Sequence, residues 1–444
     1  MGLGNLWRFP YFVSKDGGGL FLIIYLILLF TFGFTLLATE VAIGRKTKQS
    51  PLTAYGYIHQ KWKNLGILSC LVPAIILPYY CAIGGWVLKY FLLYLSGSGV
   101  DAAADGYFIG FITGQLEPLV YMAAFFLIAM GIILAGVEKG IEGSAKIMMP
   151  ILLFLVVGIA GYSLTLEYTD AAGAVRTGMQ GLGVYLIPNP DHVTLSNIMT
   201  ILIDAMGQLF FSLSVAMGIM VAYGSYARDD ADLPDSVNKI MLCDTFVAFM
   251  AGVAIVPAVF VFMDYAGLEL AGPGLVFVAL PKIFESMGAF GSFIGVLFFL
   301  ILFFAAITSA VSIYEAVVSS IIDEFKVKRR AATLIEGAIA FALAVIVCLG
   351  YNIFYVEVTL PTGTTGQILD IMDYVTNSVL MPLIALLTSI LIGWVVGPKV
   401  IINEFEKNGH KFTYRTLYVV MIRYIAPILL TILLLDSSGL VEIG

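Results

Sequence analysis

Long stretches of apolar residues recur from one end of this 444-residue chain to the other. A helix needs about 20 such residues to cross a bilayer, and residues 19–42 and 294–322 are two of the stretches that reach this length. Only 12% of the residues are charged, against roughly a quarter in an ordinary soluble domain. The pattern predicts a polytopic membrane protein and excludes a water-soluble fold.

Continuous apolar stretches favour membrane helices over a β-barrel, whose strands alternate in polarity over about ten residues. We expect a single transmembrane domain over residues 1–444, all-α, with no soluble domain. Eleven spans are expected, the first incomplete, near 5–13, 19–43, 65–95, 118–136, 145–166, 198–223, 241–263, 290–322, 332–351, 367–396 and 416–435. The Pro/Gly-containing segment 272–287 is too short to cross, so it should form a re-entrant or surface hairpin.

Lysine and arginine residues sort between alternate loops. Seventeen lie in one set of loops, at 45, 46, 48, 61, 63, 139, 146, 228, 239, 326, 328, 329, 330, 399, 407, 411 and 415. Only Lys15, Arg176 and Lys282 lie in the opposite set. Because basic loops stay in the cytoplasm, we expect a multi-pass protein of the inner or plasma membrane, with its C-terminus outside the cell.

Ionisable residues within the spans are candidates for function, because a charge in the bilayer costs at least a few kcal/mol. The main candidates are Arg8, Glu40, Asp204, Asp244, Glu315, Asp370, Asp373 and Arg423. Glu40, Asp204, Glu315 and Arg423 could equally lie near span ends or in structural pairs. Arg8 and Asp244 are harder to explain in that way.

Two segments carry residues that allow a helix to unwind in mid-membrane: Gly2-Leu3-Gly4-Asn5, and Phe211 to Gly218. An unwound helix exposes carbonyl groups to a cation and a half-helix N-terminus to an anion, although small residues also permit close helix packing. One segment opens the first five spans and the other opens the second five, as an inverted repeat requires. Thr308 and Ser309 add hydroxyls suited to Na⁺ at mid-span, unless they bond back onto their own helix.

These motifs resemble those of the neurotransmitter:sodium symporter family, in its bacterial amino-acid transporter branch. The resemblance rests on residues 2–11, 17–25, 40–45, 207–214 and 308–309, and it covers essentially the whole chain. It implies a ten-helix inverted-repeat core of five plus five helices, with helices 1 and 6 discontinuous, and one extra helix. The first repeat would span about 1–166, the second about 194–396 and the extra helix about 413–435.

The resemblance implies import of an amino acid coupled to two sodium ions. The first ion would be bound by Asn5, Ser212, Asp244 and the carboxylate of the substrate. The second would use Thr308 and Ser309 hydroxyls and the carbonyls of Ala305 and Met1. The substrate would contact Leu3, Gly4, Ile76, Tyr80, Phe211, Ser214, Met217 and Ile313. Arg8 and Asp373 would form an external gate over Phe211, which acts as the lid.

Departures from the family pattern refine this expectation. Gly2 stands where monoamine carriers have Asp, which favours amino acids that bring their own carboxylate. Asp244 stands where Asn is common, and Ala248, one turn later, lacks the hydroxyl of chloride-dependent members. We therefore expect chloride-independent transport. Met217 between Ala216 and Gly218 replaces an aromatic residue, and flexible Met favours apolar, branched or aromatic amino acids.

The family normally has about half a helix before Gly2, and the sequence lacks this N-terminal half of helix 1. As written, the chain is expected to complete neither sodium site. An alternative function is therefore a truncated or non-transporting protein of the same kind, which binds ligand as a sensor. We expect no enzyme, because the three histidines lie in or near loops and no nucleophile pairs with a base. The expected partners are an amino acid and the lipid bilayer, with no nucleic acid and no organic cofactor.

Overall fold

The computed structural model describes residues 2–169, 173–190, 193–270, 272–361 and 363–439. Ten helical segments among these residues are long and apolar enough to span a membrane. They are Gly19–Thr47, Gln60–Leu95, Glu117–Leu134, Val137–Leu164, Leu195–Leu213, Leu233–Leu268, Phe290–Phe325, Arg329–Leu349, Ile368–Val395 and Arg415–Ser437. Each corresponds to one of the ten complete spans expected from the sequence, so the helical membrane fold is confirmed.

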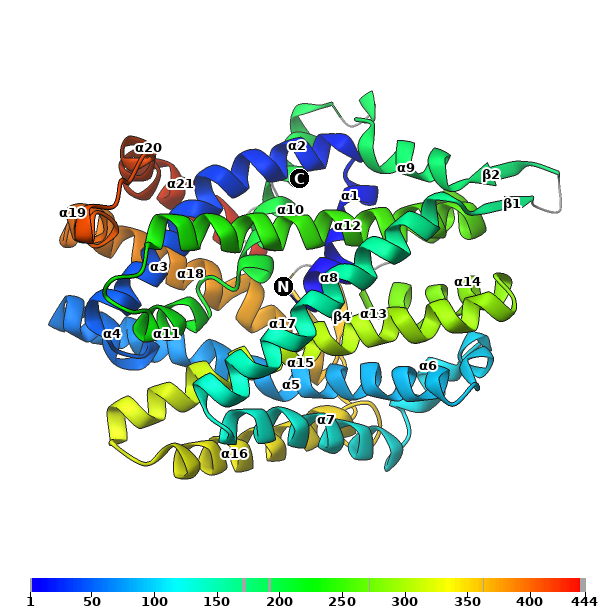
Figure 1. Cartoon of the computed structure of the whole chain (residues 1–444), viewed down its shortest axis with the longest axis horizontal. Coiled ribbons are helices and arrows are strands. Elements are labelled where there is room, and N and C mark those ends of the chain that lie inside the picture. The colour runs from blue at the N-terminus through cyan, green and yellow to red at the C-terminus, as the bar shows by residue number, and fades with distance from the viewer. Residues whose placement is uncertain (1, 170–172, 191–192, 271, 362, 440–444) are drawn as a thin grey trace.

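The helices follow one another along the chain (Figure 1), and the two longest connections between them carry the short β-hairpins. Those of the first half are α1 (Phe9–Lys15), α2 (Gly19–Leu28), α3 (Phe34–Thr47), α4 (Pro51–Ile58), α5 (Lys63–Leu95), α6 (Tyr107–Ile112), α7 (Glu117–Leu134), α8 (Gly143–Leu164) and α9 (Gly178–Leu186). Those of the second half are α10 (Leu195–Leu213), α11 (Ile219–Tyr226), α12 (Leu233–Leu268), α13 (Gly272–Gly274), α14 (Leu280–Ser286), α15 (Ala289–Phe325), α16 (Arg329–Leu349), α17 (Ile368–Asp373), α18 (Met381–Ile390), α19 (Lys399–Phe405), α20 (Arg415–Val420) and α21 (Ala426–Ser437).

Wider or tighter helical turns join several of these helices into continuous spans. The π-helical turns are Gly4–Arg8, Leu29–Gly33, Val137–Glu142, Leu275–Ala279, Tyr374–Leu380, Leu391–Val395 and Met421–Ile425. Short 3₁₀ turns are Gln60–Trp62, Gly99–Ala103 and Lys407–Gly409. Two antiparallel hairpins pair β1 (Glu167–Thr169) with β2 (Val175–Thr177) and β3 (Val358–Thr359) with β4 (Thr365–Gly366).

The first short helix is buried in the molecule. Leu6 and Phe9 are 2% and 1% exposed, and α1 packs against α12. Such burial is expected for an apolar helix inside a membrane protein, where neighbouring helices surround it. Most residues of the segment 4–13 therefore lie in the core, where its polar residues can contribute to a site.

Close helix contacts depend on glycine where α3 and α11 cross. A Cβ atom on Gly44 would lie 2.1 Å from the carbonyl oxygen of Val221, and one on Gly224 would lie 2.3 Å from that of Val41. Small residues let membrane helices approach to this distance. The crossing holds α11 against the end of α3.

The segment 272–287 forms α13, a π turn and α14 rather than an exposed hairpin. Val276 and Phe277 are 0% exposed, and the Phe277 ring packs against those of Tyr90 and Phe108 with centroid distances of 4.9 and 5.1 Å. As expected, the segment 272–287 is not one of the ten spans. It is not a surface segment, however, because most of its apolar residues are buried against the core.

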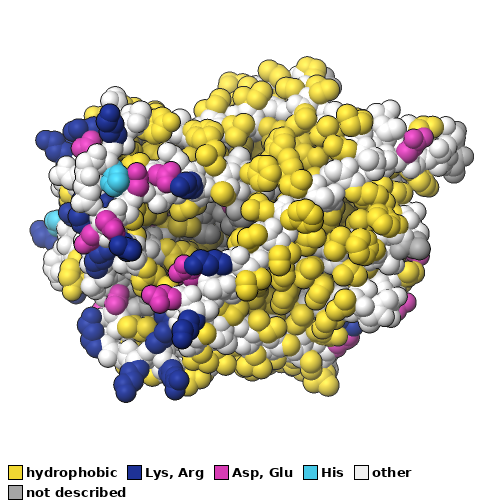
Figure 2. Space-filling view, in the orientation of Figure 1, with side chains coloured by type: hydrophobic (Ala, Val, Ile, Leu, Met, Phe, Trp, Pro, Cys, Tyr) yellow, Lys and Arg dark blue, Asp and Glu magenta, His cyan; other side chains and the backbone are white. Residues whose placement is uncertain are grey.

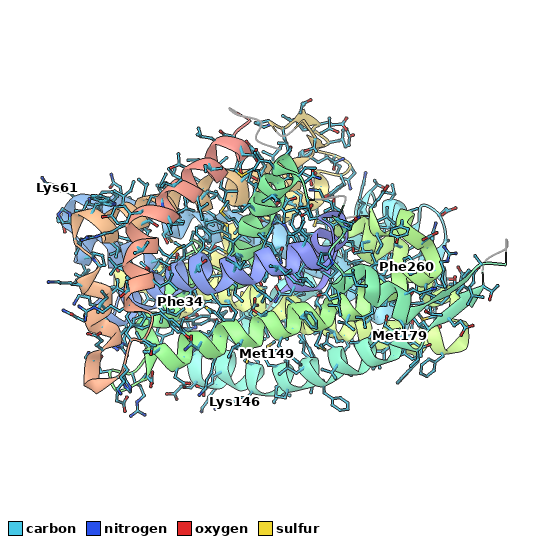
Figure 3. The ribbon with its side chains drawn as sticks, turned by 90° about the horizontal axis from the view of Figure 1, so that it is seen from above. Phe34, Lys61, Lys146, Met149, Met179 and Phe260 are labelled. Carbon is cyan, nitrogen blue, oxygen red and sulfur yellow. The ribbon has the colours of Figure 1, made fainter. Side chains whose placement is uncertain are left out.

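Charged residues gather at one end of the molecule, which we call the basic end and define by α4, α19 and the C-terminal part of α3 (Figures 1 and 2). Figure 3 shows Lys61 at this end, with Phe260 and Met179 toward the opposite one. Arg45, 1% exposed, joins α3 to α19 because its Nε donates to Glu404 Oε1 at 2.7 Å. The Arg45 Nη1 also donates to the Ala231 carbonyl at 2.7 Å.

Candidate functional site

The site is built around a break between α10 and α11. The helix ends at Leu213, Ser214 and Ala216 have φ angles of 53° and 61°, and the next helix begins at Ile219. Positive φ is uncommon for residues with a Cβ and marks strained backbone that its surroundings must hold. The expected discontinuity of the sixth helix is confirmed.

A buried carboxylate accepts a hydrogen bond from one of the backbone amides that the break leaves without a helical partner. Glu40, 3% exposed on α3, accepts a hydrogen bond from the Ala216 backbone N–H at 2.6 Å. A freed amide in a dry interior must find a partner, because an unpaired one costs as much as a lost hydrogen bond. Glu40 is thus a structural residue of the break, a role that its sequence position near a span end did not reveal.

The three residues expected at the first sodium site lie together. Asn5 Nδ2 donates to Asp244 Oδ1 at 2.8 Å, and Ser212 Oγ donates to Asn5 Oδ1 at 2.8 Å. Ser212 also hydrogen-bonds the second carboxylate oxygen of Asp244. All three side chains are buried, at 0%, 5% and 3% exposed for Asn5, Ser212 and Asp244. They form a compact group of oxygen atoms with one carboxylate.

Two further polar residues, not identified from the sequence, adjoin this group. Gln208, one turn before Ser212 on α10, donates from Nε2 to the Gly4 carbonyl at 3.3 Å. The buried hydroxyl of Tyr25 lies close to Ser212 and Asp244. Gln208 could have been predicted from the sequence, because residues four apart, such as Gln208 and Ser212, lie on the same face of a helix.

The residues expected at the second sodium site lie on α15, apart from Met1, which falls outside the described residues. Thr308 Oγ1 donates to the Phe304 carbonyl at 2.8 Å and lies 3.3 Å from that of Ala305. The Thr308 hydroxyl therefore bonds back onto its own helix, which was the alternative to a sodium site in the sequence analysis. Its oxygen still has lone pairs that can bind a cation. A Cβ atom on Gly2 would lie 2.8 Å from Ser309 Oγ, which places the start of the chain beside α15.

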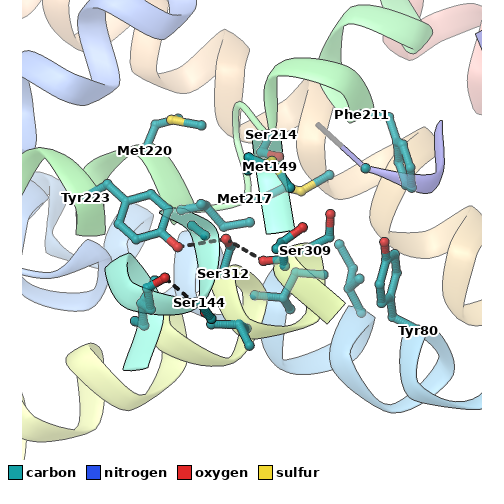
Figure 4. A pocket seen from close by; sticks show the side chains of 18 residues that line it. Tyr80, Ser144, Met149, Phe211, Ser214, Met217, Met220, Tyr223, Ser309 and Ser312 are labelled. Carbon is teal, nitrogen blue, oxygen red and sulfur yellow. Dashed lines mark hydrogen bonds between the residues drawn. The ribbon is translucent and has the colours of Figure 1, made fainter. Parts of the chain in front are cut away.

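A cavity of about 230 Å³ lies next to the break (Figure 4). Six of the eight residues expected to contact substrate line it, namely Ile76, Tyr80, Phe211, Ser214, Met217 and Ile313. Leu3 and Gly4 do not line it. Leu3 is 0% exposed, and Gly4 faces the Phe211 ring so closely that a Cβ there would lie 2.2 Å from Cδ1.

The cavity extends beyond the expected residues into a second half. This half is lined by Ile141, Ser144, Ala145, Met149, Ile219, Met220, Tyr223, Val311 and Ser312. Tyr223 and Ser312 are joined by a hydrogen bond of 2.7 Å between their hydroxyls, as Figure 4 shows. The spacing of Ile141, Ala145 and Met149 by four residues could have identified one helical face. Figure 2 shows this side of the molecule hollowed next to the basic end.

The two residues of the expected external gate lie near the cavity without touching each other. The Arg8 guanidinium lies 5.9 Å from the centre of the Phe211 ring. Asp373 accepts hydrogen bonds from the Tyr79 hydroxyl at 3.0 Å and from Asn377 Nδ2 at 2.5 Å. Among the described residues, the ion pairs within 4.0 Å do not include Arg8 with Asp373.

The other ionisable residues of the spans have structural partners. Asp204 pairs with Lys15 at 2.6 Å, and Glu315 accepts from Arg329 Nη1 at 2.9 Å. Arg423 donates from Nε to the Gly393 carbonyl at 3.0 Å. Asp204, Glu315 and Arg423 thus have structural partners, as the sequence analysis allowed for them. Two carboxylates lie at the break: Glu40 accepts from the Ala216 N–H within it, and Asp244 contacts Ser212 just before it.

Comparison with known proteins places these features in a family. The model of the sodium:neurotransmitter symporter family matches residues 1–98 and 112–441. A transporter of Bacillus subtilis strain 168, described as an uncharacterized sodium-dependent transporter, is 32% identical over 450 residues, covering 100% of this chain and 95% of that protein. One from Methanocaldococcus jannaschii with the same description is 33% identical over 464 residues, covering 100% and 88%. The human sodium- and chloride-dependent GABA transporter 2 is 25% identical over 458 residues, covering 91% and 72%.

A solved structure has the same architecture. The crystal structure of MhsT in complex with L-phenylalanine superposes with a TM-score of 0.85 at 33% sequence identity, and the match covers 98% of this chain and 96% of that one. The fold therefore has the ten-helix inverted-repeat core with an additional helix that the sequence indicated. The match to the family model, the full-length relatives and the shared architecture together show that this chain belongs to the sodium:neurotransmitter symporter family.

Proposed function

We propose that this protein is a sodium-coupled symporter that imports an apolar or aromatic L-amino acid by alternating access. The observation that carries the proposal is the cavity of about 230 Å³ beside an unwound helix, next to a buried group of oxygens from Asn5, Ser212 and Asp244. Unwound helices at mid-membrane are where transporters of this type bind ions and substrates.

The cavity suits an amino acid with a large apolar side chain. Ile76, Ile313, Met217 and Phe211 supply its apolar wall. Tyr80 lines the same cavity with its buried hydroxyl, next to Ser309 and Leu3. That hydroxyl would donate to the substrate carboxylate. The solved structure of MhsT contains L-phenylalanine, which supports the same substrate class.

Two sodium sites fit the oxygen groups of the site. Asn5, Ser212 and Asp244 would bind the first ion together with the substrate carboxylate, because hard cations prefer oxygen ligands. The second would be bound by Thr308 and Ser309 hydroxyls with backbone carbonyls of Ala305 and Met1. The names of the bacterial and archaeal relatives describe them as sodium-dependent.

We propose that Asp244 supplies the negative charge that other transporters obtain from chloride. Its carboxylate is buried at 3% exposed and contacts both Asn5 and Ser212. A buried carboxylate is favourable when a cation neutralises it. Ala248, one turn later, offers no group to bind an anion.

Two further parts of the proposal concern the orientation of the protein and its external gate. We propose that the basic end faces the cytoplasm, because basic loops remain there, so the C-terminus lies outside. The half of the cavity lined by Ser144 and Tyr223 would then be the cytoplasmic exit. Arg8 and Asp373 would pair across the external side only after substrate and sodium fill the site.

Binding measurements with the purified protein test this function. Displacement of labelled L-phenylalanine should be strongest with Leu, Trp and Tyr, should require sodium in place of potassium, and should be unchanged when gluconate replaces chloride. Stronger displacement by polar amino acids would contradict the substrate class. A several-fold loss on chloride removal would refute the role of Asp244.

A further inference from the structure

A second cavity lies at the basic end, away from the proposed transport site. Its volume is about 220 Å³, and three segments line it. These are the last turns of α3, the end of α4 and the connection from the π turn 391–395 into α19. The lining residues are Lys46, Thr47, Tyr57, Ile58, Val396 and Val400.

Four lysines that line the cavity or follow or precede its lining residues in sequence form no ion pair among the described residues. Lys46 lines it, Lys399 directly precedes the lining residue Val400, and Lys61 and Lys63 follow Ile58 within five residues. All four are exposed. The ion pairs of the described residues include none of the four, whereas the nearby Lys48 and Lys407 both pair with Asp229. The cavity therefore carries positive charge that the protein does not neutralise.

An apolar and aromatic surface adjoins the cavity. Tyr57 is 69% exposed, and Trp394 and Val395, which precede the lining residue Val396, are 61% and 44% exposed. Trp and Tyr are enriched where the lipid headgroups meet the hydrocarbon. The opening thus combines a basic recess with an adjacent surface that acyl chains can cover.

We propose that this cavity binds the headgroup of an anionic phospholipid. Lys46 would contact the phosphate inside the cavity, Lys399 and Lys61 would contribute at its mouth, and the acyl chains would lie along Trp394 and Val395. Basic pockets between membrane helices bind anionic lipid headgroups by this combination of charge and apolar contact. A water-soluble anion could use the charge alone, but it would leave the exposed apolar surface uncovered.

A bound headgroup would contact α3, α4 and the start of α19 at once. Arg45 and Glu404 already join α3 to α19 within the protein. A lipid bridging the same helices should therefore raise the thermal midpoint of the protein. This inference does not depend on transport, so it stands or fails independently of the proposed function.

Tryptophan fluorescence provides a direct test with the full chain in vesicles. Trp394 and Trp62 lie in or beside the segments that form the cavity, whereas Trp7 and Trp86 are buried at 8% and 3% exposed. Phosphatidylcholine vesicles would be titrated with phosphatidylglycerol that is brominated near the headgroup, with brominated phosphatidylcholine as the lipid control. The anionic lipid should quench at a lower mole fraction than the zwitterionic one.

Substitutions then locate the binding. Lys46→Ala should weaken the preference for phosphatidylglycerol by about five-fold, since a lysine at an anionic surface is worth about 1 kcal/mol, and Lys46→Ala with Lys399→Ala should weaken it further. Lys46→Arg, which keeps the charge, should preserve the preference and show that the site tolerates substitution.

The matched control removes two unpaired charges from a different part of the chain. Lys328 directly precedes α16 and Arg330 is its second residue; both are exposed and neither lines the cavity. Lys328→Ala with Arg330→Ala should leave both the lipid preference and its stabilising effect intact. The proposal is overturned if the double variant of Lys46 and Lys399 keeps the parent preference, or if the control pair lowers it equally.

Discussion

Replacing Gly4 by alanine should displace the Phe211 ring that covers the proposed substrate site. An added Cβ would lie 2.2 Å from Phe211 Cδ1 and 2.7 Å from Cε1, whereas carbon atoms in contact are about 3.5 Å apart or more. The ring or the backbone must therefore move by about 3.5 − 2.2 = 1.3 Å. Overpacking of this kind costs typically about 1–3 kcal/mol.

The cost should appear mainly in substrate binding. Phe211 lines the cavity, so its ring can move into that space while the site is empty but not when a substrate fills it. If the whole cost falls on the bound state, the affinity decreases by about 5- to 150-fold. The Tm without substrate should change less than the Tm with saturating substrate.

Equilibrium binding of labelled L-phenylalanine in sodium measures this effect. Gly131→Ala on α7 is the matched control, because a Cβ there meets no atom within 4 Å, and alanine is the better helix former by up to about 1 kcal/mol. Adding Gly4→Ala to Phe211→Ala should cost little, since the clashing ring is gone. Unchanged affinity in Gly4→Ala, or an equal loss with and without the Phe211 ring, would refute the reasoning.

Three further predictions concern charged residues. Asp244→Asn should raise the sodium concentration for half-maximal substrate binding by at least about ten-fold. A charge about 4 Å from the ion contributes up to ~4 kcal/mol at an effective dielectric constant of about 20. A sodium titration equal to that of the parent protein would exclude Asp244 as a ligand. Glu404→Gln should lower the free energy of unfolding by about 3–5 kcal/mol, because it leaves the buried Arg45 without its carboxylate partner. Glu406→Gln removes only a surface pair with Arg415 and should change that free energy by under about 1 kcal/mol. Equal Tm shifts in the two variants would contradict this. Burial raises the pKa of Asp16, between α1 and α2, to about 7. Its contribution to stability should therefore be greatest below about pH 4 and decline as the pH rises through 7. Asp16→Asn should remove the corresponding decline in Tm, and an unaltered slope of Tm against pH would show that another group causes it.

The spans and the break in the sixth helix could be predicted because they depend on local sequence. An apolar stretch of sufficient length must span the membrane as a helix, and the small and hydroxyl residues at 212–218 mark where such a helix unwinds. Asn5, Ser212 and Asp244 were identified through a resemblance in motifs, and the structure places them in contact.

The features that escaped prediction depend on pairs of residues that are distant in sequence. The hydrogen bond from Ala216 to Glu40 joins residues 176 positions apart, and the ion pair of Arg45 with Glu404 joins residues 359 apart. No periodicity encodes such pairs. Arg8 and Asp373 were expected to pair, but the ion pairs within 4.0 Å among the described residues do not include them; a sequence pattern does not specify such a distance.

Uptake into proteoliposomes tests the central claim most directly. An inward sodium gradient should drive accumulation of labelled L-phenylalanine above its external concentration, and a sodium ionophore should abolish that accumulation. Asp244→Asn and Gly4→Ala should reduce it, while Gly131→Ala should not. Sodium-dependent binding without any accumulation would contradict symport and identify the protein as one that binds its ligand without transporting it.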